Sequence, residues 1–340
     1  MKKTGKIFII LSLAALAAWI IPWLYNLATV QGYRSPFTLY SSVVHDFTTI
    51  VASESKSITF EDTAGNRYDE TVQPLFYSSI LIAHGTMPDS LEGRPITREA
   101  IDSNSAMLSL SPDEVNRKTP PVHLLMESVP PILNLEDPED AFISRKDGLH
   151  VYHMETNEEL PEKSAAFTEA LRKEGFVFPV ALTAANPTDH KPYDEGYLLT
   201  DKAGHLFHLK QVDGAPFAER IAAADALDIR EILITEFKDR RTLGLVMTTD
   251  GKLNFLTAER EIIPTDVPYN PMEDDFLLIR DIFYYTLKVS DDKGDNYYAL
   301  RTDDFSLVKE LHRPRPTHWR MPRLAFTSSK DRYVKPRFRR

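Results

Sequence analysis

The chain has 340 residues, 42% of them hydrophobic and 26% charged, which suits two average domains or one large β domain and excludes wholesale disorder. It has no cysteine, and this excludes disulfides, thiolate nucleophiles and cysteine-ligated zinc or iron–sulfur centres. It has only 13 glycines and neither a GxGxxG nor a GxxxxGK[ST] string, so we expect no glycine-rich phosphate-binding loop.

The N-terminus combines a basic start with a long apolar run. The most apolar part, residues 7–24, would span roughly 27 Å as a helix, close to the hydrocarbon thickness of a bilayer. We predict that residues 1–30 form a cytoplasmic tip and a transmembrane anchor, because lysines gather before the run and aromatic rings at its far end. The predicted membrane-interface residues are Lys2, Lys3, Lys6, Trp19, Trp23 and Tyr25.

A cleaved signal peptide is the alternative for this segment. The string Ala15-Leu16-Ala17 has the small-x-small form that signal peptidase recognises. We favour the anchor, because the apolar run continues past this point and cleavage would leave a strongly apolar terminus. Both interpretations export residues 31–340.

One pattern recurs along the exported part: an apolar strand, an acid-containing turn with glycine, and a second strand. It occurs around Gly65, Gly148, Gly204, Gly251 and Gly294. Asp, Asn and Gly tolerate the left-handed backbone that tight hairpins need, so we predict five hairpins. The last three turns are 47 and 43 residues apart, a period that suits four strands per repeat. We predict a mainly β fold of antiparallel hairpin repeats in a propeller-like arrangement, with a large meander or sandwich, or an α+β fold, as the alternative.

Helices are expected to be few. The segment 161–174 begins with Pro161, carries Arg172 and Lys173 near its end, and stops before Gly175, which are typical helix start and stop signals. Its predicted apolar face contains Ala166, Phe167, Ala170 and Leu171.

Proline density and charge divide the chain further. Five prolines between residues 119 and 140 exclude a long helix or central strand, and they predict a linker. We therefore expect a first β-rich lobe with this linker at 31–135, a hairpin-repeat lobe containing the helix at 136–311, and a basic aromatic tail at 312–340. The tail carries a net charge of +9 and residues 31–311 carry −22.

The tail alternates arginines with aromatic residues. Nucleic acid would be the expected partner of such a segment in the cytoplasm, but export excludes it. Two interpretations remain: the tail lies on anionic lipid headgroups, or it docks against the acidic body of the protein. The residues concerned are Arg313, Arg315, Arg320, Arg323, Lys335, Arg337, Arg339 and Arg340.

Metal and cofactor sites are not expected. The pairs His150/His153 and His205/His208 are three residues apart, so on a strand each pair points to opposite faces. The acidic turn at 291–296 lacks the full calcium-loop spacing, and turn chemistry accounts for it.

Paired carboxylates are the one feature that suits catalysis. A hydrolase of glycan or peptide built on two of them is the alternative function, although neighbouring strand residues face opposite ways. The pairs are Glu158 and Glu159, Asp274 and Asp275, and Asp303 and Asp304.

Two stretches resemble an uncharacterised family of bacterial membrane-anchored proteins. They are SPFTLYSSVVHDF at 35–47, and the region from Ala166 through FVFPVALTAANPT to YDEGYLLTDKAGHLFHLKQV. The resemblance covers most of the chain up to about Leu311 and implies one N-terminal membrane segment followed by an extracytoplasmic domain of unknown function. It carries over no catalytic or ligand residue, and the basic tail departs from it.

Together these observations predict a protein of the bacterial inner membrane, with the N-terminus in the cytoplasm and the C-terminal domain in the periplasm, or a periplasmic protein if the signal is cleaved. We expect a binding or accessory module of the envelope, with transporter proteins as candidate partners, rather than an enzyme.

Overall fold

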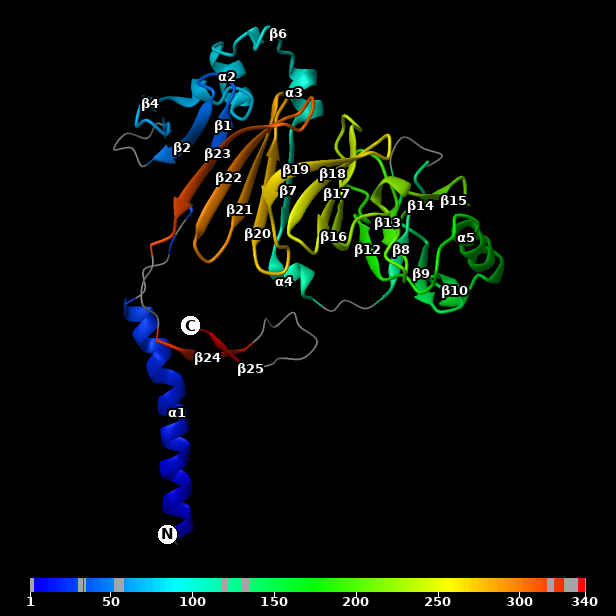
Figure 1. The fold of residues 1–340 in the computed structure, drawn as a ribbon, viewed down its shortest axis with the longest axis horizontal. Coiled ribbons are helices and arrows are strands. Elements are labelled where there is room, and N and C mark those ends of the chain that lie inside the picture. Colours follow the sequence, from blue (N-terminus) through cyan, green and yellow to red (C-terminus); the bar gives the residue numbers. More distant parts are fainter. Residues whose placement is uncertain are drawn as a thin grey trace.

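The structure, a computed structural model, describes residues 3–29, 33, 35–51, 58–117, 121–129, 135–316, 321–326 and 336–339. In these ranges the chain is mainly β with few helices, and its named strands pair antiparallel (Figure 1). An N-terminal helix, α1 (Lys3–Thr29), projects away from the sheets. The predicted mainly β class and the predicted apolar N-terminal helix are both confirmed.

Five sheets of four or five strands form most of the body within the described ranges, and we number them I to V in chain order. Sheet I contains β1 (Thr38–Ser41), β2 (Asp46–Val51), β3 (Thr59–Glu61) and β4 (Arg67–Tyr68). Sheet II contains β8 (His123–Leu125), β9 (Asp140–Arg145), β10 (Gly148–His153) and β11 (Glu158–Glu159). Sheet III contains β12 (Leu182–Ala185), β13 (Tyr197–Thr200), β14 (Leu206–Val212) and β15 (Ala215–Arg220). Sheet IV contains β16 (Ile229–Ile234), β17 (Thr242–Thr248), β18 (Lys252–Thr257) and β19 (Ile262–Pro268). Sheet V contains β20 (Asp275–Arg280), β21 (Tyr284–Ser290), β22 (Gly294–Arg301) and β23 (Leu307–Pro314), with β7 (Ala106–Leu110) beside β20.

The sheets stand in a row in the order II, III, IV, V, I, because each neighbouring pair shares a hydrophobic core. The row does not close on itself: among the described residues no core cluster joins sheet I to sheet II, and no closed propeller is seen. Each shared core contains residues of both sheets: Phe142 and Phe207 for II and III, Leu198 and Val246 for III and IV, Phe255 and Tyr285 for IV and V, and Phe47 and Tyr297 for I and V.

The inner sheets are buried on both faces. In β13, Tyr197 and Leu199 belong to the core shared with sheet II, whereas Leu198 belongs to the core shared with sheet IV. Successive strand residues point to opposite faces, so a strand between two cores needs apolar side chains at consecutive positions. The run YLLT is therefore the sequence of an inner strand.

All five predicted hairpins are present. Those at Gly148, Gly204, Gly251 and Gly294 join the second and third strands of sheets II to V, and that at Gly65 joins β3 to β4. Gly204 has φ +90, the left-handed backbone expected for such a turn.

Gly294 has a different reason to be glycine from the one predicted, because its φ is not positive. A Cβ at this position would lie 2.2 Å from the carbonyl oxygen of Arg313 on β23. The close approach of the neighbouring strand, rather than turn geometry, excludes a side chain there.

The chain between sheets I and II wraps over the end of the row and then enters sheet V. Strand β7 pairs with β20, so the ranges predicted as two lobes share one sheet.

In the proline-rich segment, β8 is a three-residue edge strand, a position that tolerates neighbouring prolines. The other elements before sheet II are η1 (Glu70–Val72), α2 (Ser78–His84), β5 (Ser90–Leu91), β6 (Arg94–Pro95), α3 (Arg98–Asn104) and α4 (Pro112–Val115), and η2 (Ala222–Ala224) follows sheet III.

Helix α5 (Pro161–Lys173) confirms the predicted helix, but its buried face differs from the expected one. Phe167 and Leu171 are buried as predicted, whereas Ala166 is exposed. Ser164 and Thr168 take the remaining places on the buried face. Their hydroxyl groups accept hydrogen bonds from the backbone N–H groups of β10, at Val151 (2.8 Å) and Leu149 (2.9 Å), so the helix covers the part of the β10 edge that the two-residue β11 leaves open.

Candidate functional site: the corner beside the N-terminal helix and the polar clusters

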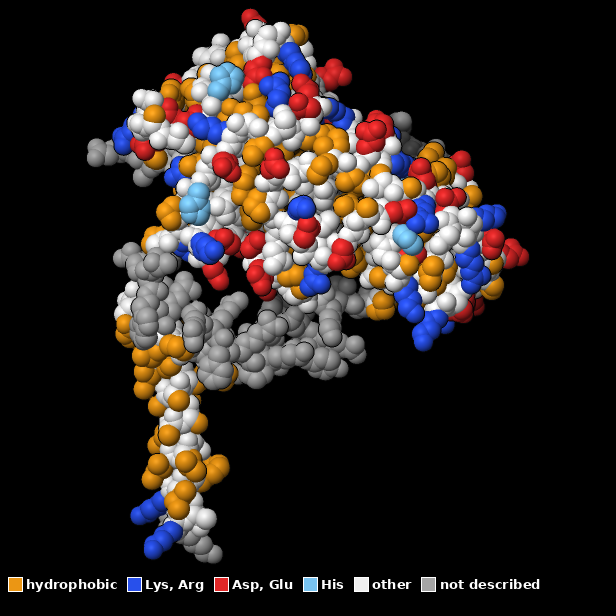
Figure 2. Space-filling view, viewed as in Figure 1, with side chains coloured by type: hydrophobic (Ala, Val, Ile, Leu, Met, Phe, Trp, Pro, Cys, Tyr) orange, Lys and Arg blue, Asp and Glu red, His pale blue; other side chains and the backbone are white. Residues whose placement is uncertain are grey.

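Helix α1 carries the predicted membrane-interface residues at its two ends. Lys3 and Lys6 are exposed near the free tip, and Trp19 and Trp23 are about half exposed towards the other end. None of its side chains is buried, and apolar side chains line the helix along its length (Figure 2). The helix is long and apolar enough to be a membrane anchor or a signal sequence. Lys2 lies outside the described residues.

The C-terminal tail returns to the outer end of this helix. Strand β24 (Arg323–Phe326) pairs with β25 (Pro336–Arg339) in a two-stranded ribbon beside α1. The side chain of Asn26 donates to the backbone oxygen of Met321 (2.9 Å) and accepts from its backbone nitrogen (2.8 Å). This pair of hydrogen bonds joins residues 295 positions apart in the sequence.

Both chain segments that connect α1 and the ribbon to the body meet at one corner of sheet V. The hydroxyl of Tyr33 donates to Asp295 (2.8 Å), and the guanidinium of Arg315 lies over the ring of Tyr33 at 5.2 Å. Next to them, the ammonium of Lys288 donates to the hydroxyl of Ser35 (2.6 Å). The N-terminal and C-terminal segments therefore hold each other as well as the sheet.

Burial and hydrogen bonding set the charges at this corner. Burial, together with the hydrogen bond to Asp295, raises the pKa of Tyr33 to about 12, so the phenol stays protonated as a donor. Burial alone would raise the pKa of Asp295, but hydrogen bonds from Ser35, Ser290 and Tyr33 outweigh it and hold that pKa below its usual range. Asp295 is thus a buried carboxylate that anchors the segment after α1.

The tail residues named from the sequence fall into three groups. Arg313 on β23 donates to the hydroxyl of Thr49 on sheet I, and Arg315 stacks on Tyr33, so both contact the body. Arg323, Arg337 and Arg339 occupy strand positions in β24 and β25. Arg320, Lys335 and Arg340 lie outside the described residues.

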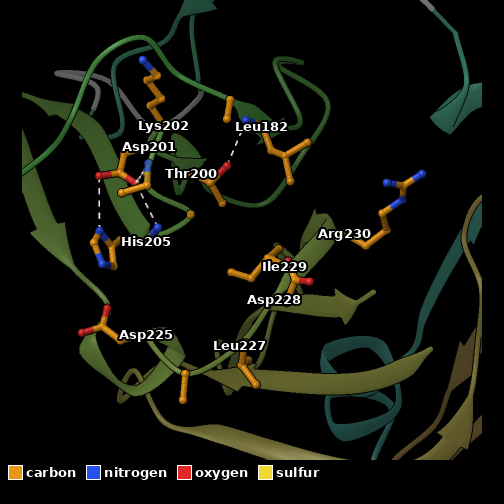
Figure 3. A pocket seen from close by; sticks show the side chains of 14 residues that line it. Leu182, Thr200, Asp201, Lys202, His205, Asp225, Leu227, Asp228, Ile229 and Arg230 are labelled. Atoms are coloured by element: carbon orange, nitrogen blue, oxygen red, sulfur yellow. Dashed lines mark hydrogen bonds and ion pairs between the residues drawn. The ribbon is translucent and has the colours of Figure 1, made fainter. Parts of the chain in front are cut away.

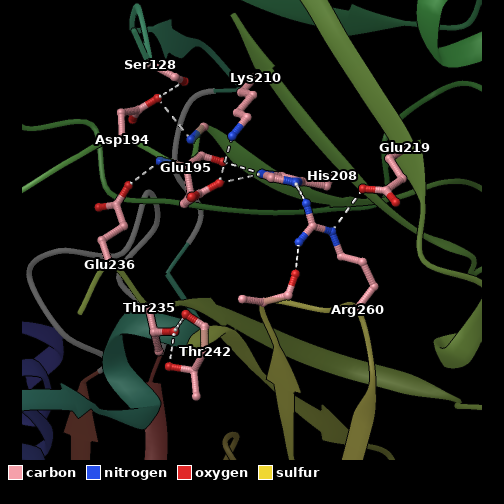
Figure 4. Close-up of polar contacts among 12 residues, drawn as sticks. Ser128, Asp194, Glu195, His208, Lys210, Glu219, Thr235, Glu236, Thr242 and Arg260 are labelled. Atoms are coloured by element: carbon pink, nitrogen blue, oxygen red, sulfur yellow. Dashed lines mark hydrogen bonds and ion pairs between the residues drawn. The ribbon is translucent and has the colours of Figure 1, made fainter. Parts of the chain in front are cut away.

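A second polar cluster lies where the loops of sheets III and IV meet (Figure 4). The ammonium of Lys191 lies 2.5 Å from Asp194 and 2.6 Å from Glu236, and all three side chains are 2–3% exposed. Burial raises the pKa of Glu236, although Lys191 and the backbone N–H of Glu195 act against that shift. The triad joins the β12–β13 loop to the β16–β17 loop, and a separation of 45 residues hid it from sequence reasoning.

His208 extends this cluster from β14. Its Nε2 donates to the backbone oxygen of Glu195 (2.7 Å), and its Nδ1 accepts from Arg260 (3.3 Å). Burial lowers the pKa of His208 to about 4, so the ring is neutral with its proton on Nε2. Arg260 in turn pairs with Glu219 (2.9 Å).

In each histidine pair noted in the sequence, at least one ring is engaged with carboxylates. His205 precedes β14 and lies 3.4 Å from Asp201, whereas His208 contacts Glu195 and Arg260. His150 contacts Asp147 and Glu159. Across the residues that the structure describes, no group of three or more histidine, aspartate or glutamate side chains could hold a metal ion.

A pocket of about 500 Å³ opens between sheets III and IV (Figure 3). Its carboxylates are already engaged within the protein. Asp201 accepts the backbone N–H groups of its own turn, Asp225 pairs with Arg220 (3.0 Å), and Asp228 accepts from Thr249 (2.6 Å). The pocket offers polar walls, not a free pair of carboxylates.

Each pair of carboxylates named from the sequence has at least one member that is engaged with a partner of its own, and in the second pair Asp274 accepts the backbone N–H of Asn270 (2.9 Å). Glu159 bonds His150 (2.7 Å), Asp303 bonds Arg94 (2.7 Å), and Asp304 bonds the hydroxyl of its own turn residue, Ser306 (2.6 Å). In the acidic turn at 291–296, Asp291 accepts the backbone N–H groups of residues 293 and 294, which is turn chemistry.

One charged residue in the core was not anticipated. Arg280 is fully buried between sheets IV and V, where it bonds Asp239 and the side chain of Asn104 (3.1 Å). Its guanidinium lies 5.3 Å from the ring centre of Tyr285. These contacts tie α3 and the β16–β17 loop to the end of the core.

The geometry defines a class: a mainly β body of successive antiparallel sheets, joined at one corner to an N-terminal helix that could anchor it or act as a signal sequence. The profile of a domain of unknown function, DUF4857, matches residues 37–300, and the chain belongs to this family. No curated protein matches the sequence.

Two solved structures show distant likeness. One is PorZ, described as an essential bacterial surface component of the type-IX secretion system of Porphyromonas gingivalis, with 10% identity and a TM-score of 0.25. The other is the dihydro-heme d1 dehydrogenase NirN, with 12% identity and a TM-score of 0.26. The matches cover 84% and 74% of this chain, which spans 28% of the PorZ chain and 64% of the NirN chain. Likeness at this level carries no argument about function.

Proposed function

We propose that this protein is a single-pass membrane protein that holds its row of sheets on the periplasmic side of a bacterial inner membrane, as a binding or accessory module. The observation that carries the proposal is α1, a 27-residue apolar helix with no buried side chain that stands clear of the body (Figure 1). An apolar surface of this length needs lipid around it, because none of the body residues that the structure describes covers it.

The charge distribution supports the orientation. Lysines lie only at the free tip of α1, and the positive-inside rule then keeps this tip in the cytoplasm. Cleavage after Ala17 would leave residues 18–29, including the half-exposed Trp19 and Trp23, as an apolar end without cover. This favours a retained anchor over a cleaved signal.

The body supports a binding role. Its four-stranded meanders have the strand order of propeller blades, and we treat them as blade-like repeats in an open array. Such an array presents one loop after another from a stable scaffold, which is the usual arrangement of binding surfaces. Transporter proteins of the same membrane are the partner class that we propose for it.

Fusions to alkaline phosphatase and to green fluorescent protein, placed after Arg34 and at the C-terminus, test the orientation. We expect phosphatase activity and no fluorescence at both places, with an N-terminal mass that retains residues 1–30. Replacing Lys3 and Lys6 by Gln is the matched variant, and it should weaken the orientation without changing the body. Fluorescent fusions in the wild-type chain would overturn the proposal.

Co-purification from gently solubilised membranes tests the accessory role. We expect other membrane proteins to elute with the full chain, and to remain when α1 is exchanged for an unrelated transmembrane helix of equal length, because the body carries the binding surface. Recovery of the chain alone in several mild detergents and after cross-linking would contradict an accessory function.

A further inference from the structure

The β24–β25 ribbon lies where the membrane surface is expected. It is joined to α1 at Asn26, three residues beyond Trp23, which is about 5 Å along the helix axis at 1.5 Å per residue. When residues 7–24 occupy the hydrocarbon, this level is that of the lipid headgroups. Figure 1 shows the ribbon running across the direction of α1, and therefore along the plane of such a membrane.

The register of the ribbon separates charge from apolar surface. Arg323 pairs with Arg339 and Ala325 with Arg337, whereas Leu324 pairs with Phe338 and Phe326 with Pro336. Cross-strand partners share a face, and successive residues alternate between faces. The positions of three arginines therefore fall on one face and those of four apolar residues on the other.

The charge of this part of the chain has no counterpart nearby in the sequence. Residues 316–340 contain eight lysines and arginines and one acid, Asp331. Arg313 and Arg315, which contact the body, precede this segment and are not part of it. Figure 1 places the ribbon beside α1 and clear of the five sheets.

We infer that the β24–β25 ribbon is a second membrane-binding element, which lays its apolar face among the lipid chains and holds its arginines against anionic phospholipid headgroups. The inference rests on the membrane placement of α1 proposed above. An amphipathic ribbon with basic residues is suited to an interface of this kind, where apolar burial and attraction to anionic lipid act together. The role of the arginines is to select negatively charged lipid, and that of α1 is to provide the anchor.

The absence of cysteine allows a direct test with the full chain in lipid nanodiscs. An environment-sensitive fluorophore is attached at Leu324→Cys on the apolar face, or at Ala325→Cys on the opposite face. We expect quenchers in the lipid chains to quench the label at 324 more than the label at 325, when the nanodiscs contain phosphatidylglycerol. A label at Met107→Cys, an exposed position on sheet V, should not be quenched.

Charge variants then assign the effect to the arginines. Replacing Arg323, Arg337 and Arg339 by Gln should shift the ratio of bound to free ribbon by roughly 100-fold, because each basic residue near an anionic surface contributes about a factor of five. The matched control replaces three exposed arginines of the body, Arg67, Arg98 and Arg230, and should change nothing.

The outcomes separate this inference from the proposed function. A label at 324 that stays unquenched in anionic nanodiscs overturns the inference, even when the fusions confirm the orientation of α1. Equal quenching in neutral and anionic nanodiscs overturns the part assigned to the arginines. A label that is buried alike in detergent and in lipid would show that the ribbon docks on the body, and this also overturns the inference.

Discussion

The loop junction of sheets III and IV and the corner of sheet V both gather charged side chains, but they balance charge differently. At the junction, Lys191 has two carboxylates within 2.6 Å and all three groups are buried. At the corner, Asp295 accepts hydrogen bonds from hydroxyl groups and has the ammonium of Lys288 at 3.6 Å, while the guanidinium of Arg315 stacks on the ring of Tyr33. The junction pairs its charges within the protein and fixes loops, whereas the corner leads into a basic segment for which we propose anionic lipid as the partner.

Removing the cation of the junction should have the largest effect. Lys191→Met leaves Asp194 and Glu236 buried without a counter-charge, and we expect a loss of about 3–5 kcal/mol in the free energy of unfolding. Denaturant unfolding in detergent, followed by circular dichroism, measures it. Lys252→Met, at an exposed pair with Asp250, is the control and should leave stability unchanged. A loss no larger than that of the control would mean that the junction does not hold the loops.

The pH dependence of stability should reveal the neutral histidine of the same cluster. His208 has a pKa of about 4 in the folded protein against 6.5 unfolded, so the unfolded chain binds the proton first as pH falls. Stability due to this group is present above pH 6.5 and is lost between pH 6.5 and 4, by about 3 kcal/mol.

His208→Gln should flatten the pH profile in that window, and His190→Gln, at a side chain 90% exposed, should not. Unfolding curves at half-unit pH steps measure the slope. Unchanged slopes in the His208 variant would show that other groups cause the acid sensitivity.

At the corner, Asp295→Asn exchanges a buried carboxylate for an amide that cannot accept from all of its donors. We expect a loss of about 2 kcal/mol, with faster proteolysis of the segment between α1 and β1. Asp292→Asn, at an exposed position of the same turn, serves as the control. A loss of stability without faster proteolysis would mean that Asp295 stabilises sheet V but does not hold the segment after α1.

The smallest effect is expected at Arg315. Arg315→Gln removes the stacking on Tyr33, which should cost about 0.5–1 kcal/mol, and should loosen the approach of the tail to α1. Hydrogen exchange at Met321 and Asn26 would report the loosening, with Arg230→Gln as the control. A loss as large as that at Lys191 would mean that the corner, too, is a closed charge cluster.

Local chemistry made part of this fold predictable. The hairpins at Gly65, Gly148, Gly204 and Gly251 follow from turn residues with a positive φ, and α5 from its end signals. The period near 45 residues corresponds to four-stranded sheets because each repeat is one meander.

Long-range partners were not predictable in this way. Nothing local to Lys191 points to Glu236, and nothing in β7 points to β20. Ala166 is apolar and was predicted to be buried, but it is exposed. Ser164 and Thr168 are buried in its place, because the backbone of β10 supplies their hydrogen-bond partners. At the candidate interface, the sequence predicted the residues of α1 but not the ribbon beside them, since a hairpin between residues 323 and 339 has no turn glycine.

The hydroxyl groups of Ser164 and Thr168 on α5 also affect how readily copies of the protein aggregate. A free strand edge is the usual template on which β proteins join into intermolecular sheets and aggregate. On β10, the N–H groups of Leu149 and Val151 already donate to Thr168 and Ser164. A strand of a neighbouring molecule could not pair with these occupied donors. This end of the row therefore resists edge-to-edge aggregation even at high protein concentration.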